Sequence, residues 1–116
     1  MTNKLSDSYT KFCALVAAVR ALPTTPKMTP TEEMVLNKLI VRLGNGERVS
    51  VVGFMENCGD FSPTTVHRVV SRLKKIGLVT TVEDVQDGRR KYISPTKQCE
   101  KYLLQMGKAM SAAAQA

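Results

Sequence analysis

Apolar residues recur along most of the chain at the three- and four-residue spacing of helices. The first such segment predicts a helix from about Leu5 to Ala21. Its apolar positions alternate between steps of four and three, the seam of a coiled coil, and they are Leu5, Tyr9, Phe12, Val16 and Val19. The run Pro23-Thr24-Thr25-Pro26 then ends the helix, because proline cannot continue one. We expect residues 1–22 to form a dimerisation helix.

A second helix has clear start and stop signals. Thr29 is the expected N-cap, Pro30 the first helical residue, and Glu32 completes a Thr-x-x-Glu capping box. Helical spacing defines its inner face, which consists of Val35, Leu36, Leu39, Ile40 and Leu43. Gly44-Asn45-Gly46 supplies the residues that favour a helix end.

Two more helices follow, joined by a turn that contains glycine. Ser50 is expected to cap a short helix that ends at Cys58-Gly59, where glycine tolerates a left-handed backbone. Ser62 and Pro63 start the next helix. Its apolar stripe consists of Val66, Val69, Val70, Leu73 and Ile76. Two helices in this order predict a helix-turn-helix.

After Gly77 the pattern changes to that of a β-hairpin. Leu78–Val82 is rich in β-branched residues, Asp87-Gly88 forms a polar tip, and Arg90–Ile93 is the returning strand. Thr96 or Ser94 then caps a last, short helix whose apolar face consists of Cys99, Tyr102, Leu103, Met106 and Met110. We expect residues 111–116 to form a flexible tail. The chain is thus predicted to be mainly α with a small β-hairpin, with a winged helix-turn-helix over residues 29–110.

Composition narrows the range of functions. The chain of 116 residues is long enough for one domain with a core, and its apolar fraction of 43% is ordinary for a globular protein. The cysteines Cys13, Cys58 and Cys99 are odd in number and form no CxxC pattern, which argues against a disulfide framework or a zinc site. All three are expected to be structural, with a redox sensor as the alternative for Cys13.

Further features argue against an enzyme and against a membrane protein. His67 is the single histidine, so no histidine-paired nucleophile and no site of several histidines can form. We therefore expect no catalysis, no metal and no cofactor. The chain has no apolar run near the roughly 18 residues of a membrane span and no secretory signal, so a cytoplasmic location is expected.

Positive charge gathers in the second half of the chain. Lys and Arg number 17 against 10 acidic residues, a net charge of +7, which favours polyanionic partners. The helix from Pro63 to Ile76 carries hydrogen-bonding or cationic residues away from its apolar stripe, namely Thr64, His67, Arg68, Ser71, Arg72 and Lys75. Arg89, Arg90 and Lys91 add charge at the hairpin. The helix alone could be an ordinary solvated face, but two basic elements together indicate binding to nucleic acid.

Two stretches of sequence carry a family resemblance. These are Thr65-Val66-His67-Arg68, leading to Gly77-Leu78-Val79, and Asp87-Gly88-Arg89, leading to Ser94-Pro95-Thr96. Between about Thr29 and Met110 the chain resembles the multiple-antibiotic-resistance regulator (MarR) family of winged helix-turn-helix proteins. That family has a Ser/Thr-Val-x-Arg recognition helix, a Gly-Leu-Val start to the wing, an Asp-x-Arg wing tip and a Ser-x-Thr start to the next helix.

The resemblance implies residue roles. Thr65 and Arg68 would face the major groove of DNA or its flanking phosphates, Arg89 would enter the minor groove, and Asp87 would orient Arg89. His67 and Gly88 depart from the family pattern, so no base preference is transferred. The chain also has room for only one short carboxy-terminal helix, so no small-molecule effector is predicted.

The sequence therefore predicts a homodimeric transcriptional regulator that binds specific double-stranded DNA. The alternative is a winged-helix subunit that mediates protein interactions in a nucleic-acid-processing machine.

Overall fold

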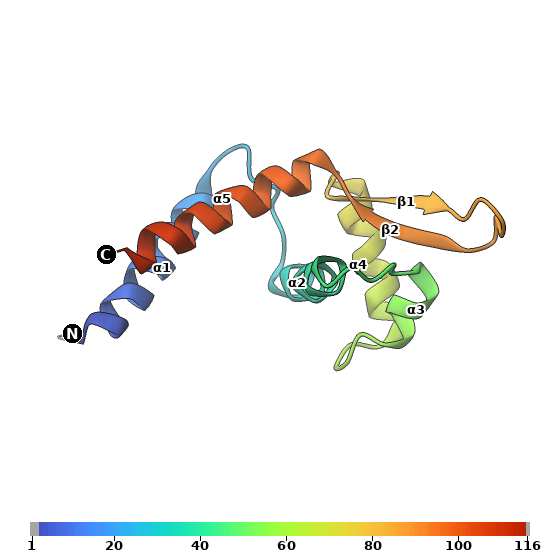
Figure 1. Cartoon of the computed structure of the whole chain (residues 1–116), viewed down its shortest axis with the longest axis horizontal. Helices are drawn as coiled ribbons and strands as arrows, with labels where there is room; N and C mark the ends of the chain where they lie inside the picture. Colours follow the sequence, from blue (N-terminus) through green and yellow to red (C-terminus); the bar gives the residue numbers. More distant parts are fainter. Residues whose placement is uncertain (1–2, 116) are drawn as a thin grey trace. The chain divides into compact units, whose positions relative to one another are not determined.

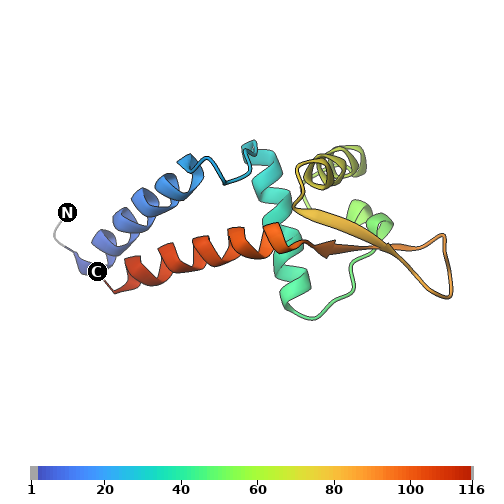
Figure 2. The same cartoon turned by 90° about the horizontal axis from the view of Figure 1, so that it is seen from above.

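The computed structural model describes residues 3–115, which fall into two compact units (Figures 1 and 2). One unit is Met28–Cys99, and the other combines the chain up to Lys27 with the stretch from Glu100 onward. The elements in chain order are α1 (Lys4–Ala21), α2 (Pro30–Gly44), α3 (Val51–Glu56), α4 (Pro63–Lys75), β1 (Val79–Glu83), β2 (Lys91–Pro95) and α5 (Lys97–Ala114). This order confirms the predicted winged helix-turn-helix.

Side-chain oxygens cap the helices at the predicted residues. The Thr29 hydroxyl accepts from the Glu32 backbone N–H at 3.2 Å, and the Glu32 carboxylate accepts from the Thr29 N–H at 2.9 Å. Ser50 and Ser62 accept from backbone N–H groups in the first turns of α3 and α4. For α5 the cap is Thr96, whose hydroxyl accepts from the Cys99 N–H at 3.1 Å, whereas Ser94 lies in β2. These bonds satisfy N–H groups that a helix start leaves unpaired.

The core of the Met28–Cys99 unit forms around α4. The predicted stripe of α4 is buried, apart from Ile76, which is half-buried and ends the helix. Its neighbours in the core come from α2, α3 and the hairpin, and they are Val35, Leu36, Leu39, Phe54, Leu78 and Ile93. Burial of each large apolar side chain contributes about 1.5–3 kcal/mol, so this packing fixes α4 firmly against α2 and α3.

The hairpin is one residue later than predicted at the start of each strand. Gly77 has φ +87° and ends α4 with a left-handed turn, in which the Leu78 N–H donates to the Leu73 carbonyl at 2.9 Å. Leu78 therefore belongs to this turn, and β1 begins at Val79, opposite Pro95 of β2. The residues before α3 also join the sheet edge, because the Ile93 N–H donates to the Val49 carbonyl at 2.8 Å. No pattern in the sequence predicted this third extended segment.

The unit that holds α1 differs from the prediction in two respects. Residues 111–116 were expected to be a flexible tail, but α5 is helical through Ala114, and Ala113 is only 3% exposed. The last helix is therefore 18 residues long rather than short, because alanine has the highest helix propensity and its small side chain packs closely. Residue 116 lies outside the described residues.

The cysteines divide between the core and the surface. Cys58 and Cys99 are buried as expected, whereas Cys13 is exposed on α1. Among residues 3–115 no helix is both long enough and apolar enough to cross a membrane.

Gly77 and Gly107 make a matched test of the turn that ends α4. Gly77→Ala should lower the free energy of unfolding by about 1–2 kcal/mol, because its left-handed φ disfavours any Cβ. A Cβ there would also lie 2.6 Å from Oε1 of Gln98. Gly107→Ala, in open space within α5, should instead raise stability by about 0.5–1 kcal/mol. Urea denaturation of both variants measures the difference. Equal effects would contradict the assigned turn.

Candidate nucleic-acid interface

Apart from Pro63 at its start, the exposed residues of α4 are polar or cationic. Because the apolar stripe of α4 is buried, the opposite side of the helix faces solvent. There the structure brings together Thr64, His67, Arg68, Ser71 and Lys75, all of them exposed. This surface presents hydrogen-bond donors and acceptors together with positive charge, the groups that address base edges and phosphates.

Thr65 and Arg72 were predicted to bind DNA, but each has a partner within the protein. Thr65 is half-buried, and its hydroxyl oxygen accepts from the Ser62 hydroxyl at 2.9 Å. Nε of Arg72 lies 3.7 Å from Oε2 of Glu32, whose side chain is almost fully buried. Arg72 thus compensates the charge of the residue that caps α2. The capping box predicted the role of Glu32, but nothing in the sequence indicated that Arg72 would lie beside it.

A lysine at the end of α4 connects that helix to the wing. Nζ of Lys74 donates to the Thr81 hydroxyl of β1 at 3.1 Å. The next residue, Lys75, is exposed. The bond ties the hairpin to the last turn of α4, and Lys74 was not among the predicted site residues.

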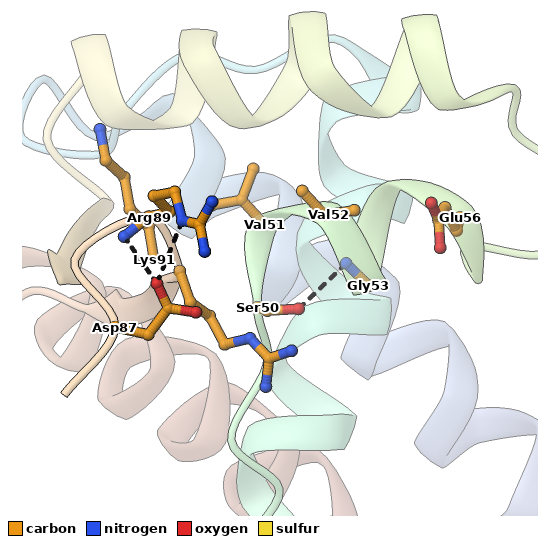
Figure 3. Close-up of a pocket in the computed structure, with 9 residues that line it drawn as sticks. Ser50, Val51, Val52, Gly53, Glu56, Asp87, Arg89 and Lys91 are labelled. Carbon is orange, nitrogen blue, oxygen red and sulfur yellow. Dashed lines mark hydrogen bonds and ion pairs between the residues drawn. The ribbon is translucent and has the colours of Figure 1, made fainter. Parts of the chain in front are cut away.

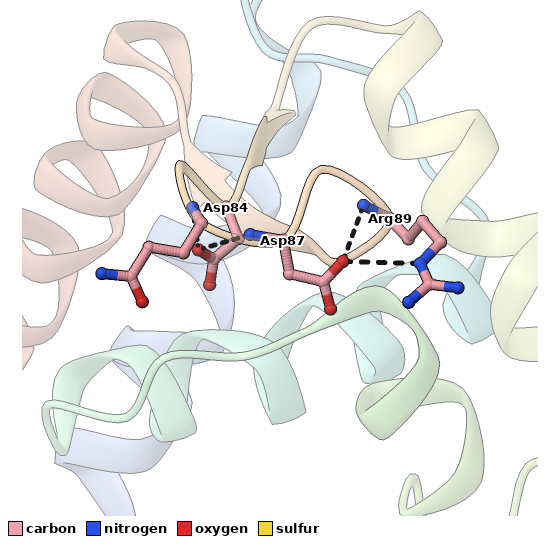
Figure 4. A network of polar contacts seen from close by, with 4 residues as sticks. Asp84, Asp87 and Arg89 are labelled. Carbon is pink, nitrogen blue, oxygen red and sulfur yellow. Dashed lines mark hydrogen bonds and ion pairs between the residues drawn. The ribbon is translucent and has the colours of Figure 1, made fainter.

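Two aspartates organise the wing tip (Figure 4). The Asp84 carboxylate accepts from the Gln86 N–H at 2.9 Å and from the Asp87 N–H at 3.3 Å. These two hydrogen bonds are the main reason why the pKa of Asp84 lies below its usual value. The Asp87 carboxylate accepts from the Arg89 N–H at 3.2 Å and lies 3.6 Å from Nε of the same arginine. This is the contact between Asp87 and Arg89 that the resemblance implied.

The three consecutive cations of the wing have different surroundings. The side chain of Arg89 is 97% exposed. Tyr92 is the main influence on Arg90 and raises the pKa of its guanidinium. Lys91, opposite Glu83 in the hairpin, is exposed. Of the three, Arg89 projects furthest into solvent.

A pocket of about 540 Å³ separates the wing from the start of α3 (Figure 3). Arg89 and Lys91 line it from the wing, and Ser50 and Gly53 line it from α3. Asp87 and Glu56 also line it, so the pocket lining carries both positive and negative charge. Among the described residues no group of three or more His, Cys, Asp or Glu side chains is placed to hold a metal ion.

Comparison with known proteins gives the fold an independent reference. Neither a protein-family model nor a curated protein matches the sequence. Among solved structures, the PcaV transcriptional regulator from Streptomyces coelicolor is 25% identical with a TM-score of 0.54, over 88% of this chain and 66% of that chain. A probable transcriptional regulator from Pseudomonas aeruginosa is 26% identical with a TM-score of 0.52, over 94% and 78%.

A third solved structure contains DNA. It is a mutant form of MepR from S. aureus bound to an oligodeoxyribonucleotide, 17% identical with a TM-score of 0.64, over 95% of this chain and 72% of that chain. At that identity the likeness concerns the fold alone. PcaV and MepR are regulators of the MarR family, and the chain spans between 66% and 78% of the length of these three neighbours. The fold and the neighbours confirm the resemblance drawn from the motifs: the chain is a MarR-like winged-helix protein.

Proposed function

We propose that the chain is a transcriptional regulator that binds specific double-stranded DNA, with α4 in the major groove and the wing in the minor groove. The observation that carries this proposal is the exposed polar and cationic face of α4, held by the buried face opposite. It is supported by neighbours that are transcriptional regulators, one of them solved with an oligodeoxyribonucleotide.

The free side chains of the interface receive distinct roles. Arg68 addresses base edges, because a guanidinium can donate two hydrogen bonds to guanine. Thr64, His67 and Ser71 flank it, and Lys75 holds a backbone phosphate. Thr65 and Arg72, which have partners inside the protein, support the helix rather than read bases.

The wing adds contacts of a second kind. Arg89, which is almost fully exposed and held at its base by Asp87, enters the minor groove, where negative potential attracts arginine. Lys91 contacts phosphate. Arg90, which lies near Tyr92, is assigned no base contact.

We further propose a homodimer formed through α1 with the help of α5. Leu5 and Tyr9 of the α1 seam are 80% and 68% exposed, a cost in free energy that a second copy would remove. Of the remaining seam residues, Phe12 and Val19 are half-buried and Val16 is buried. Largely apolar hollows of about 370 and 230 Å³, lined by α1 and α5, offer further surface. A two-fold dimer would read an inverted repeat with centres about 34 Å apart.

Arg68→Ala tests whether α4 recognises the base sequence of DNA. At the preferred site, selected from random duplexes, the substitution should cost about 1–3 kcal/mol of binding free energy and flatten the preference over random DNA. Fluorescence anisotropy across salt concentrations measures both effects. Lys101→Ala, which removes an exposed charge from α5, is the control and should leave the preference unchanged. Wild-type protein without salt-dependent duplex binding would contradict the proposed function.

Arg72→Ala tests whether Arg72 stabilises the folded protein rather than recognising bases. It leaves the buried Glu32 carboxylate without its cation, so the free energy of unfolding should fall by about 1–2 kcal/mol, discounted because Arg72 is 44% exposed. Arg68→Ala should change stability by less than about 0.5 kcal/mol. Urea denaturation measures stability, and anisotropy of the folded variants measures preference. An Arg72→Ala protein of normal stability that has lost its sequence preference would reverse the two assignments.

Substitutions of exposed apolar residues test the dimer. Leu5→Asp with Tyr9→Asp should convert a wild-type dimer to monomers at micromolar concentration, because the paired seam would bury the new charges. Sedimentation velocity measures the mass. Met34→Asp is the control, since Met34 is an exposed apolar residue of α2 outside the proposed interface. The dimer is refuted by a monomeric wild type that binds one half-site as tightly as the inverted repeat.

A further inference from the structure

The pocket between the wing and the start of α3, which we call the wing pocket, has cations on one side and apolar side chains on the other (Figure 3). The wing contributes Arg89, Arg90 and Lys91, which are all exposed. The start of α3 contributes Val51 and Val52. Val52 is 63% exposed, although folded proteins usually bury valine. An occupant that carries an anionic group next to an apolar group would match both sides.

The acidic residues of the wing pocket leave two of its cations without an ion pair. Asp87 is engaged with Arg89, whose Nε lies 3.6 Å from the carboxylate and whose backbone N–H donates to it. Glu56 ends α3 and lies at the far end of that helix from the wing side chains (Figure 3). Among the residues that the structure describes, neither Arg90 nor Lys91 forms an ion pair. These two side chains are therefore available to an anion.

α3 contacts both elements that enter DNA in the proposed function, namely α4 and β2 of the wing. The sugar–phosphate backbone of one strand separates the major groove of a duplex from the adjacent minor groove. With α4 in the first groove and the tip of the wing in the second, this backbone has to pass between the two elements. It therefore crosses the protein over the start of α3, where the wing pocket opens.

The backbone of DNA carries the two kinds of group that the wing pocket would accommodate. Its phosphates are anionic, and lysine and arginine side chains hold them. The deoxyribose between two phosphates exposes C–H groups, which the methyl groups of a valine can contact at van der Waals distance. An apolar side chain that is exposed in the free protein would then be covered in the complex.

We propose that the wing pocket binds one phosphate of DNA and the deoxyribose attached to it. Arg90 and Lys91 hold the phosphate, and Val51 and Val52 contact the sugar. The proposal rests on the proposed function, because it requires α4 and the wing to bind the same duplex. It adds α3 to the DNA interface and assigns Arg90 to the backbone. Contacts to the backbone position the duplex and carry no sequence information, so this site contributes affinity rather than base preference.

Val52 and Val41 make a matched pair of exposed valines for the test. They are 63% and 61% exposed, and Val41 lies in α2, outside the wing pocket. Val52→Glu should lower duplex affinity about tenfold, because it places a carboxylate beside the phosphate. Val52→Lys should raise affinity about three- to tenfold and steepen the slope of log affinity against log salt by about 1. The same substitutions at Val41 should change affinity less than about twofold, because salt screens distant charges.

These changes cannot be mistaken for effects on folding. Val52 lies in the first turn of α3, where a carboxylate favours the helix and an ammonium disfavours it. The expected changes in affinity therefore run opposite to the expected changes in stability. Fluorescence anisotropy across salt concentrations measures affinity, and urea denaturation measures the free energy of unfolding. The ratio of affinities for the preferred site and for random DNA should stay unchanged in all four variants.

Duplexes with one uncharged methylphosphonate in place of a phosphate locate the contact. At one position of the preferred site, the replacement should weaken binding of the wild type about three- to tenfold. At that position it should weaken binding of Arg90→Ala much less, because the partner of the phosphate is already gone. Equal effects of the Val52 and Val41 substitutions, or the same methylphosphonate profile for wild type and Arg90→Ala, would overturn this site alone. A wild type that does not bind duplex DNA would overturn the proposed function with it.

Discussion

The structure depends on the complete burial of one face of α4. Val66, Val69, Val70 and Leu73 are almost inaccessible to solvent, and they contact a core supplied by α2, α3 and the hairpin. A helix that is locked on one side cannot rotate about its axis, so the side chains opposite keep a constant direction. The Cα–Cβ directions along the exposed face from Thr64 to Lys75 are therefore set by the core on the other side of the helix. A rigid duplex is recognised best by groups in fixed positions. A contact that moves within a groove loses its hydrogen-bond geometry and therefore part of its binding free energy.

Local signals in the sequence predicted the helices well. The caps at Thr29, Ser50 and Ser62 involve residues three positions apart, and such bonds form as soon as the chain turns. The apolar stripe of α4 likewise needs only helical periodicity. The tail was misjudged because a run of alanines has no amphipathic pattern, although its propensity for helix is high.

Contacts between residues far apart in sequence could not be predicted in the same way. Nothing in the sequence around Arg72 indicates that Glu32 lies beside it, forty residues earlier along the chain. The same holds for Arg48 above Tyr92 and for the edge contact between Val49 and Ile93. These contacts divide the basic residues into two groups. Some cations stabilise the protein and others stay available to a polyanion, so net charge overstates the number of phosphates that the surface can hold.

Thr96 joins the turn that ends α4 to the start of α5. Its hydroxyl donates to the Gly77 carbonyl at 2.6 Å and accepts from the Cys99 N–H, while its own N–H donates to the Leu78 carbonyl. One residue therefore fixes both the turn that ends α4 and the first turn of α5. Because Thr96 and the first residues of α5 belong to the winged unit, the start of α5 cannot shift without disturbing the turn that ends α4. The first turn of α5 is thus bound to the winged unit by both side-chain and backbone hydrogen bonds.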